Sequence, residues 1–100
     1  MTLKELTALM DPGESSCFTP WTQDEQLCLG VNRACLDTTL GHFPKRLDFN
    51  TQDEFHDAHY QWVSRAKSLA IEMLTNFAKK HGLSSTIEVD AWDKPRLAVK

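Results

Sequence analysis

The side chains most suited to chemistry gather between positions 53 and 59, where two histidines stand among acids: Asp53, Glu54, His56, Asp57 and His59. Asp53 and His56 are three residues apart, so on a helix they share a face and could ligate one metal ion. His59 points to another side. One helix supplies at most two convergent ligands, and no His-Glu-x-x-His motif is present. We therefore predict no metal and no other cofactor, with Asp53 and His56 as the only candidate ligands.

The same segment has a structural interpretation. Thr51 and Glu54 have the spacing of a capping box, and acids in the first turns of a helix interact favourably with its dipole. On this interpretation the carboxylates of Asp53, Glu54 and Asp57 stay exposed. They then become candidate contacts for a basic surface on a partner.

The sequence contains no motif for other kinds of catalysis. Ser15, Ser16 and Cys17 are adjacent but lack a Gly-x-Ser-x-Gly frame, and the four glycines are too dispersed for a phosphate-binding loop. The odd cysteine count (Cys17, Cys28 and Cys35), without a Cys-x-x-Cys, argues against a disulfide framework and against a Cys-rich zinc site. We expect three buried thiols in a protein that is not an enzyme.

Composition and charge narrow the class of protein. The chain has 100 residues, of which 41% are hydrophobic and 25% charged, as in ordinary globular domains with one core. It contains no long apolar run and its first residues do not resemble a signal peptide, so we expect a cytoplasmic protein that does not enter a membrane. Residues 1–60 hold ten acids against four Lys or Arg, which disfavours direct binding to nucleic acid.

Helical periodicity indicates three helices that must position these residues. A Thr-x-x-Glu capping box precedes each, and the second and third boxes share the tetrapeptide Thr-Gln-Asp-Glu. The third helix is apolar over half its circumference or more, so we expect it to be the spine on which the others pack. The predicted bounds are about 3–10, 24–40 and 52–81.

The pattern changes after Gly82 from helical to alternating. A turn follows near Asp93 and Pro95, so we predict a β-hairpin over about 86–99, with Trp92 facing outward. The expected fold class is therefore mainly α, with a three-helix core around one long helix and a small C-terminal β-hairpin (α+β). We expect one domain over 1–100.

The predicted helix 24–40 has two apolar stripes, and the second is formed by Leu29, Leu36 and Leu40. A helix with two such stripes is covered on both sides within the fold, or it offers one stripe to a partner. We take these three leucines and Trp92, together with the exposed acids, as the candidate partner-binding residues.

These features favour a non-catalytic protein-binding module. One form is a small acidic inhibitor or adaptor that masks a basic, nucleic-acid-handling protein, analogous in size and charge to anti-CRISPR and other phage anti-defence proteins. Two alternatives stay open. One is a small metal-binding protein or enzyme centred on His56, His59 and the nearby acids. The other is a self-associating structural protein, a homodimer joined through the hairpin edge or the leucine stripe.

Overall fold

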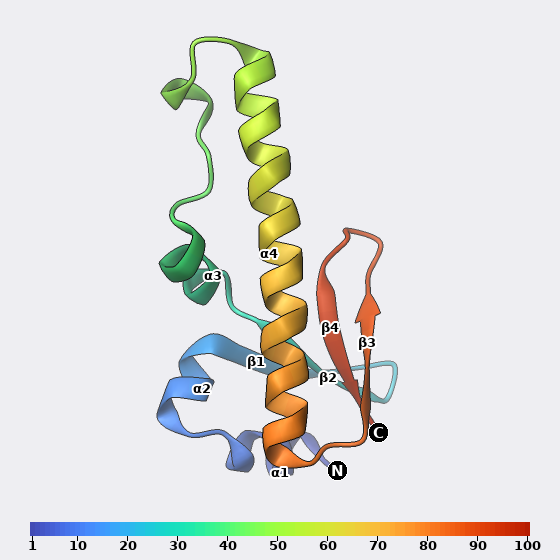
Figure 1. Ribbon diagram of the computed structural model, residues 1–100. Helices are drawn as coiled ribbons and strands as arrows, with labels where there is room; N and C mark the ends of the chain where they lie inside the picture. The colour runs from blue at the N-terminus through green and yellow to red at the C-terminus, as the bar shows by residue number, and fades with distance from the viewer.

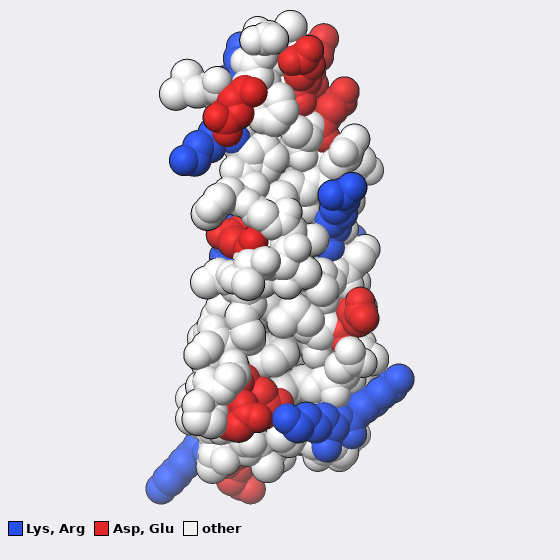
Figure 2. Space-filling model, turned by 60° about the vertical axis from the view of Figure 1, so that its left-hand side comes forward, with Lys and Arg blue, Asp and Glu red and all other residues white.

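A single helix, α4 (Gln52–His81), runs the length of the molecule (Figure 1). The computed structural model describes all of residues 1–100. Thirty residues of α-helix span about 45 Å, close to the longest dimension of 49 Å, and the space-filling view has the same elongated outline (Figure 2). The Thr51 hydroxyl caps the helix by accepting from Glu54 N, and Gly82 ends it with a φ of 62°. The predicted bounds of 52–81 are confirmed.

Four antiparallel strands form one sheet in the order β1-β2-β4-β3. Two hairpins from opposite ends of the chain build it, and they join where Leu27 of β2 pairs with Val99 of β4 and Leu29 with Leu97. The predicted C-terminal hairpin exists, but it is half of this larger sheet. The strands are β1 (Phe18–Gln23), β2 (Gln26–Val31), β3 (Ser85–Val89) and β4 (Pro95–Val99).

The predicted fold class, a mainly α protein with a three-helix core, is therefore wrong. Strands and helices are spread through the whole chain, and the four strands form one antiparallel sheet, which makes this an α+β fold. The error lies in the predicted helix 24–40, of which only α3 (Arg33–Leu40) is helical. Asp24 and Glu25 have φ values of 51° and 65°, so they form the tight turn of the β1–β2 hairpin instead of a helical first turn.

The N-terminal segment contains two short helices. The first, α1 (Leu3–Leu9), starts at the reciprocal cap between Thr2 and Glu5, as predicted. The second, α2 (Pro12–Cys17), lies outside the three predicted helices. Pro12 follows the end of the first helix and occupies the first position of the second. At that position the N–H group that proline lacks would have no partner within the helix. Asp11 and Glu14 complete a second reciprocal cap.

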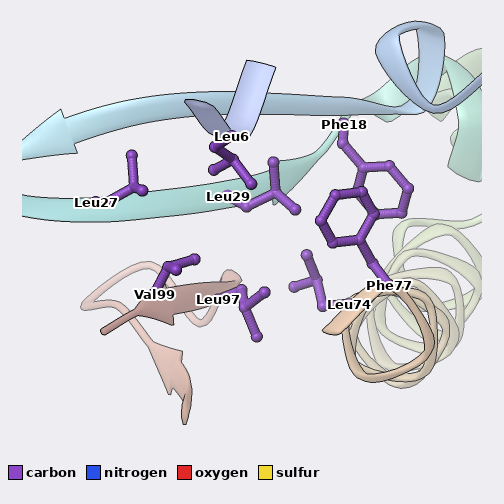
Figure 3. Close-up of a cluster of buried hydrophobic side chains, with 8 residues drawn as sticks. All are labelled: Leu6, Phe18, Leu27, Leu29, Leu74, Phe77, Leu97 and Val99. Carbon is purple, nitrogen blue, oxygen red and sulfur yellow. The ribbon is translucent and has the colours of Figure 1, made fainter. Parts of the chain in front are cut away.

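The hydrophobic core lies between one face of the sheet, α1 and the C-terminal half of α4 (Figure 3). Leu74 and Phe77 enter it from α4, and Leu6 enters from α1. The N-terminal half of α4 projects beyond the sheet and contains no buried residue before Ala66. The chain between α3 and α4, with the short helix η1 (Arg46–Asp48), runs beside that half. The eight core side chains are Leu6, Phe18, Leu27, Leu29, Leu74, Phe77, Leu97 and Val99.

The cysteines correct another expectation. Cys17 at the end of α2 and Cys35 in α3 form a disulfide, and Cys28 alone is free and buried. The β1–β2 hairpin returns the chain to its starting point, where Asn32 N donates to Cys17 O at 2.7 Å. That return brings the two cysteines together.

None of the helices is both long enough and apolar enough to cross a bilayer.

Candidate functional site

A groove of about 550 Å³ opens where the sheet ends against the middle of α4. Its walls come from four parts of the chain: α4, α3 with the segment after it, the β1–β2 hairpin and the turn between β3 and β4. We call it the tryptophan groove. Its lining residues are Thr19, Trp21, Gly30, Val31, Asn32, Arg33, Leu36, Phe43, Trp62, Val63, Ala66, Lys67, Ala70, Asp90, Trp92, Asp93, Lys94, Pro95 and Arg96.

All three tryptophans of the chain line this groove. The Trp21 ring lies against the backbone of β2, since a Cβ added at Gly30 would stand 2.9 Å from its Cζ3 atom. Trp62 is held from α4 by a hydrogen bond of 3.0 Å from its Nε1 to Gly41 O. Trp92, in the β3–β4 turn, is 83% exposed. Two indoles are thus fixed by the fold, and the third stands free at the rim.

A stacked arrangement of planar groups forms the wall next to α3. The rings of Phe43 and Trp62 meet edge to face with centroids 5.1 Å apart. The Arg33 guanidinium lies 4.6 Å from the centre of the Phe43 ring, within the range of a cation–π contact. Arg33 therefore keeps its charge at the groove wall while its planar face packs on an aromatic ring.

The opposite rim is polar and firmly held. Lys67 Nζ on α4 lies 2.7 Å from Asp93 Oδ1, which ties the β3–β4 turn to the helix. One Asp90 oxygen accepts from the backbone N–H groups of Trp92 and Lys94, each at 2.9 Å. Arg96 bonds Glu88 at 3.3 Å. These contacts shape the turn that carries Trp92.

The polar side chains of the lining are few in kind and partly engaged. It contains no histidine, cysteine, serine or glutamate. The carboxylates of Asp90 and Asp93 are engaged by backbone N–H groups and by Lys67. The lining therefore combines aromatic rings with six charged side chains, and its volume lies in the range of sites that bind a ligand or a side chain of a partner.

Two of the predicted partner-binding residues meet in this groove. Leu36, half-buried on α3, and Trp92 both line it, although 56 positions separate them. Leu40 is half-buried at the end of α3. Leu29 belongs to β2 and is fully buried in the core, so the predicted single stripe of Leu29, Leu36 and Leu40 does not exist.

The acidic candidates lie elsewhere, on the projecting end of α4. Asp53, Glu54 and Asp57 are all exposed there, and Figure 2 shows acidic side chains at that end with basic ones beside them. Trp62 follows Asp57 by five residues, or about 8 Å along the helix axis. The acidic end and the tryptophan groove are therefore neighbours on one helix.

The histidines near these acids do not form a metal centre. His59 packs edge to face on Phe43, with centroids 4.7 Å apart, and His56 is exposed. No group of three or more His, Cys, Asp or Glu side chains lies close enough together to hold a metal ion. Asp53 and His56 therefore gain no third ligand from another element.

A second polar cluster joins α2 to the C-terminal end of α4. His81 Nε2 lies 2.9 Å from Glu14 Oε2, and Lys80 Nζ lies 3.5 Å from carboxylate oxygens of both Asp11 and Glu14. Burial raises the pKa of Glu14, but the hydrogen bonds to His81 and Asp11 N outweigh it and lower that pKa overall. The hydrogen bond from Glu14 N likewise lowers the pKa of Asp11. This cluster fastens two helix ends to each other.

Sequence reasoning did not find most of the groove. It singled out Leu36 and Trp92, but it did not join Trp21, Trp62 and Phe43 to them. The available signal was the presence of three tryptophans in three different elements, and the spacing along the chain gives no measure of their distance in space.

Compared with known proteins, the chain matches no family model, no curated protein and no solved structure.

Proposed function

We propose that this protein is a non-catalytic module that binds another protein through the tryptophan groove. The observation that carries the proposal is the convergence of Trp21, Trp62 and Trp92 on one groove, with Trp92 left 83% exposed. Tryptophan dominates the energetics of many interfaces because it buries a large area in a pocket. An apolar side chain of the partner would enter between these indoles and Leu36.

The acidic end of α4 supports a basic partner. Asp57 and Asp53 precede Trp62 by five and nine residues, or about 8 and about 14 Å along the helix and about 140° and about 180° around it. A partner that contacts both the groove and these carboxylates must therefore wrap around the end of α4. Such a charge pattern speeds association with a basic surface and selects for it. The form of the proposal that this favours is an inhibitor or adaptor that covers the basic surface of a nucleic-acid-handling protein. The same carboxylates repel phosphate, so direct binding to nucleic acid is not proposed.

The compartment is also a proposal. The cytoplasm, expected from the sequence, is a reducing environment in which disulfides rarely persist. We propose that a cytoplasmic form carries Cys17 and Cys35 as thiols and that the disulfide forms under oxidising conditions.

The test is a comparison of three immobilised proteins as bait for a lysate of the native host. The wild-type chain and Leu47→Ala should capture the same amount of the same partner. Trp92→Ala should capture about tenfold less of it or lower still, a typical loss for an interface hot spot. Leu47 is the matched control, since it is a large apolar residue that is 96% exposed and lies outside the groove. Quantitative mass spectrometry reads the captured proteins, and circular dichroism confirms that each bait is folded.

Two further results decide the proposal. Replacing Asp53 and Asp57 together by Asn should weaken capture of the same partner and reduce its dependence on salt. If no captured protein depends on Trp92, or if Leu47→Ala reduces capture equally, the groove is not the binding site.

A further inference from the structure

The two edges of the sheet differ in how they are protected. The β1 edge contains Pro20, which has no N–H to offer, and both α1 and α2 pack against this strand. The β3 edge, Ser-Thr-Ile-Glu-Val, contains no proline, and β3 is the outermost strand on its side of the molecule (Figure 1). An open strand of this kind is a template for pairing with another strand.

The hydrogen-bond pattern shows which backbone groups of β3 are unused. Lys100 N donates to Ser84 O and Asp90 N donates to Lys94 O, so the even-numbered residues of β3 form the bonded pairs with β4. In an antiparallel pair the residues between them point their N–H and C=O groups the other way. The backbone groups of Ser85, Ile87 and Val89 therefore face outward from the sheet.

We propose that this edge binds a second copy of the chain, with the two β3 strands antiparallel about a two-fold axis at Ile87. In this register Ile87 lies opposite its own copy and Ser85 lies opposite the partner's Val89. Every outward backbone group of these three residues then finds a partner. The two sheets join into one of eight strands, which removes both open edges.

The side chains fit the same register. On one face Thr86 lies opposite the partner's Glu88, so no two like charges meet across the axis. On the other face Ile87 meets its own copy, and Val89, which is 45% exposed, meets the partner's Ser85. That face borders a second groove of about 320 Å³ between α4 and β3, lined in part by Ala78 and Leu83. Pairing therefore covers apolar surface that the monomer leaves open.

The register gives a test with opposite outcomes at one exposed position. Thr86→Lys sets a cation opposite the partner's Glu88 twice in the dimer, and Thr86→Glu sets a second carboxylate there. Sedimentation velocity from about 10 µM to about 1 mM should show a reversible dimer of the wild-type chain. The dissociation constant should fall by about tenfold with Thr86→Lys and rise by about tenfold with Thr86→Glu.

The matched control is Thr22→Glu, which adds the same charge to an exposed position on the other edge strand and should leave the dissociation constant unchanged. Circular dichroism confirms that each variant keeps the wild-type fold. A wild-type chain that stays monomeric throughout the range would overturn the proposal. So would a dimer whose affinity responds equally, or not at all, to the two changes at Thr86. These results are independent of the tryptophan groove, whose lining contains no residue of β3.

Discussion

Glu14 shows how a single carboxylate fastens two elements. It accepts from Asp11 N at 3.2 Å and lies 2.9 Å from His81 Nε2, although its side chain is only 13% exposed. Burial opposes ionisation, but these hydrogen bonds outweigh it, so the folded protein holds the pKa of Glu14 below its ordinary value of 4.5. A carboxylate with a lowered pKa stabilises the fold above its unfolded pKa, and this stabilisation is lost as the pH falls through the folded value.

We therefore expect Glu14→Gln to make the free energy of unfolding less sensitive to acid. The variant should be less stable than the wild-type chain at about pH 7, and the difference should shrink as the pH falls below 4.5. Urea unfolding at several pH values measures both quantities. Glu72→Gln, on the exposed side of α4, is the matched control and should keep the wild-type pH dependence. Parallel curves for wild type and Glu14→Gln would contradict this assignment.

The groove residues mark the limit of prediction at this scale. Trp62 falls in the predicted helix 52–81 and Trp92 was expected to face outward, but no strand was predicted at Trp21, which lies in β1. Nothing in the sequence around Gly30 predicted a role for it. Its missing side chain nevertheless lets the Trp21 ring lie on β2. That role depends on the neighbour across the hairpin, which the local sequence does not specify.

At the level of elements, the tetrapeptide Thr-Gln-Asp-Glu adopts two different structures. At residues 51–54 it caps α4, and at residues 22–25 it ends β1 and forms the hairpin turn. The residues that follow decide the outcome. After Thr51 a helical apolar pattern continues for thirty residues. After Thr22 the strand β2 carries a short, continuous buried run of Leu27, Cys28 and Leu29, which from periodicity alone fits a helix as well as a strand.

Two alanine substitutions distinguish these contexts. Thr51→Ala removes a hydroxyl that accepts from Glu54 N at 3.2 Å, so it should lower the free energy of unfolding by about 1 kcal/mol. Thr22→Ala changes an exposed edge-strand residue that caps nothing, so its effect should stay within about 0.5 kcal/mol. Chemical unfolding of both variants provides the measurement. Equal losses would mean that the two tetrapeptides share one local structure.

For the whole molecule, the elements predicted correctly are those that local signals define. The long helix has caps at both ends, α1 has its capping box, and the C-terminal hairpin has its alternation and turn. The error at β2 arises where a distant segment contributes to the structure. Strand β2 is a strand because it lies between β1 and β4, and β4 is more than 60 residues further along the chain. The groove inherits this limit, since its walls come from four separate parts of the chain.

The Cys17–Cys35 disulfide acts on the whole fold by closing the β1–β2 hairpin against α3. The two cysteines are 18 residues apart, and cross-linking a loop of that length removes enough chain entropy from the unfolded state to stabilise the native state by about 3 kcal/mol. Cys28 should not attack this disulfide by thiol–disulfide exchange. Its side chain is fully buried, and burial raises its pKa, so little of the reactive thiolate is present.

Reduction should therefore lower the free energy of unfolding by about 3 kcal/mol without changing the fold at low denaturant. Guanidinium unfolding with and without a phosphine reductant measures the difference. The double variant with Cys17→Ser and Cys35→Ser is the control: it should resemble the reduced wild-type chain and should not respond to reductant. A wild-type chain whose stability is unaffected by reduction would mean that the β1–β2 hairpin and α3 hold their positions without the cross-link.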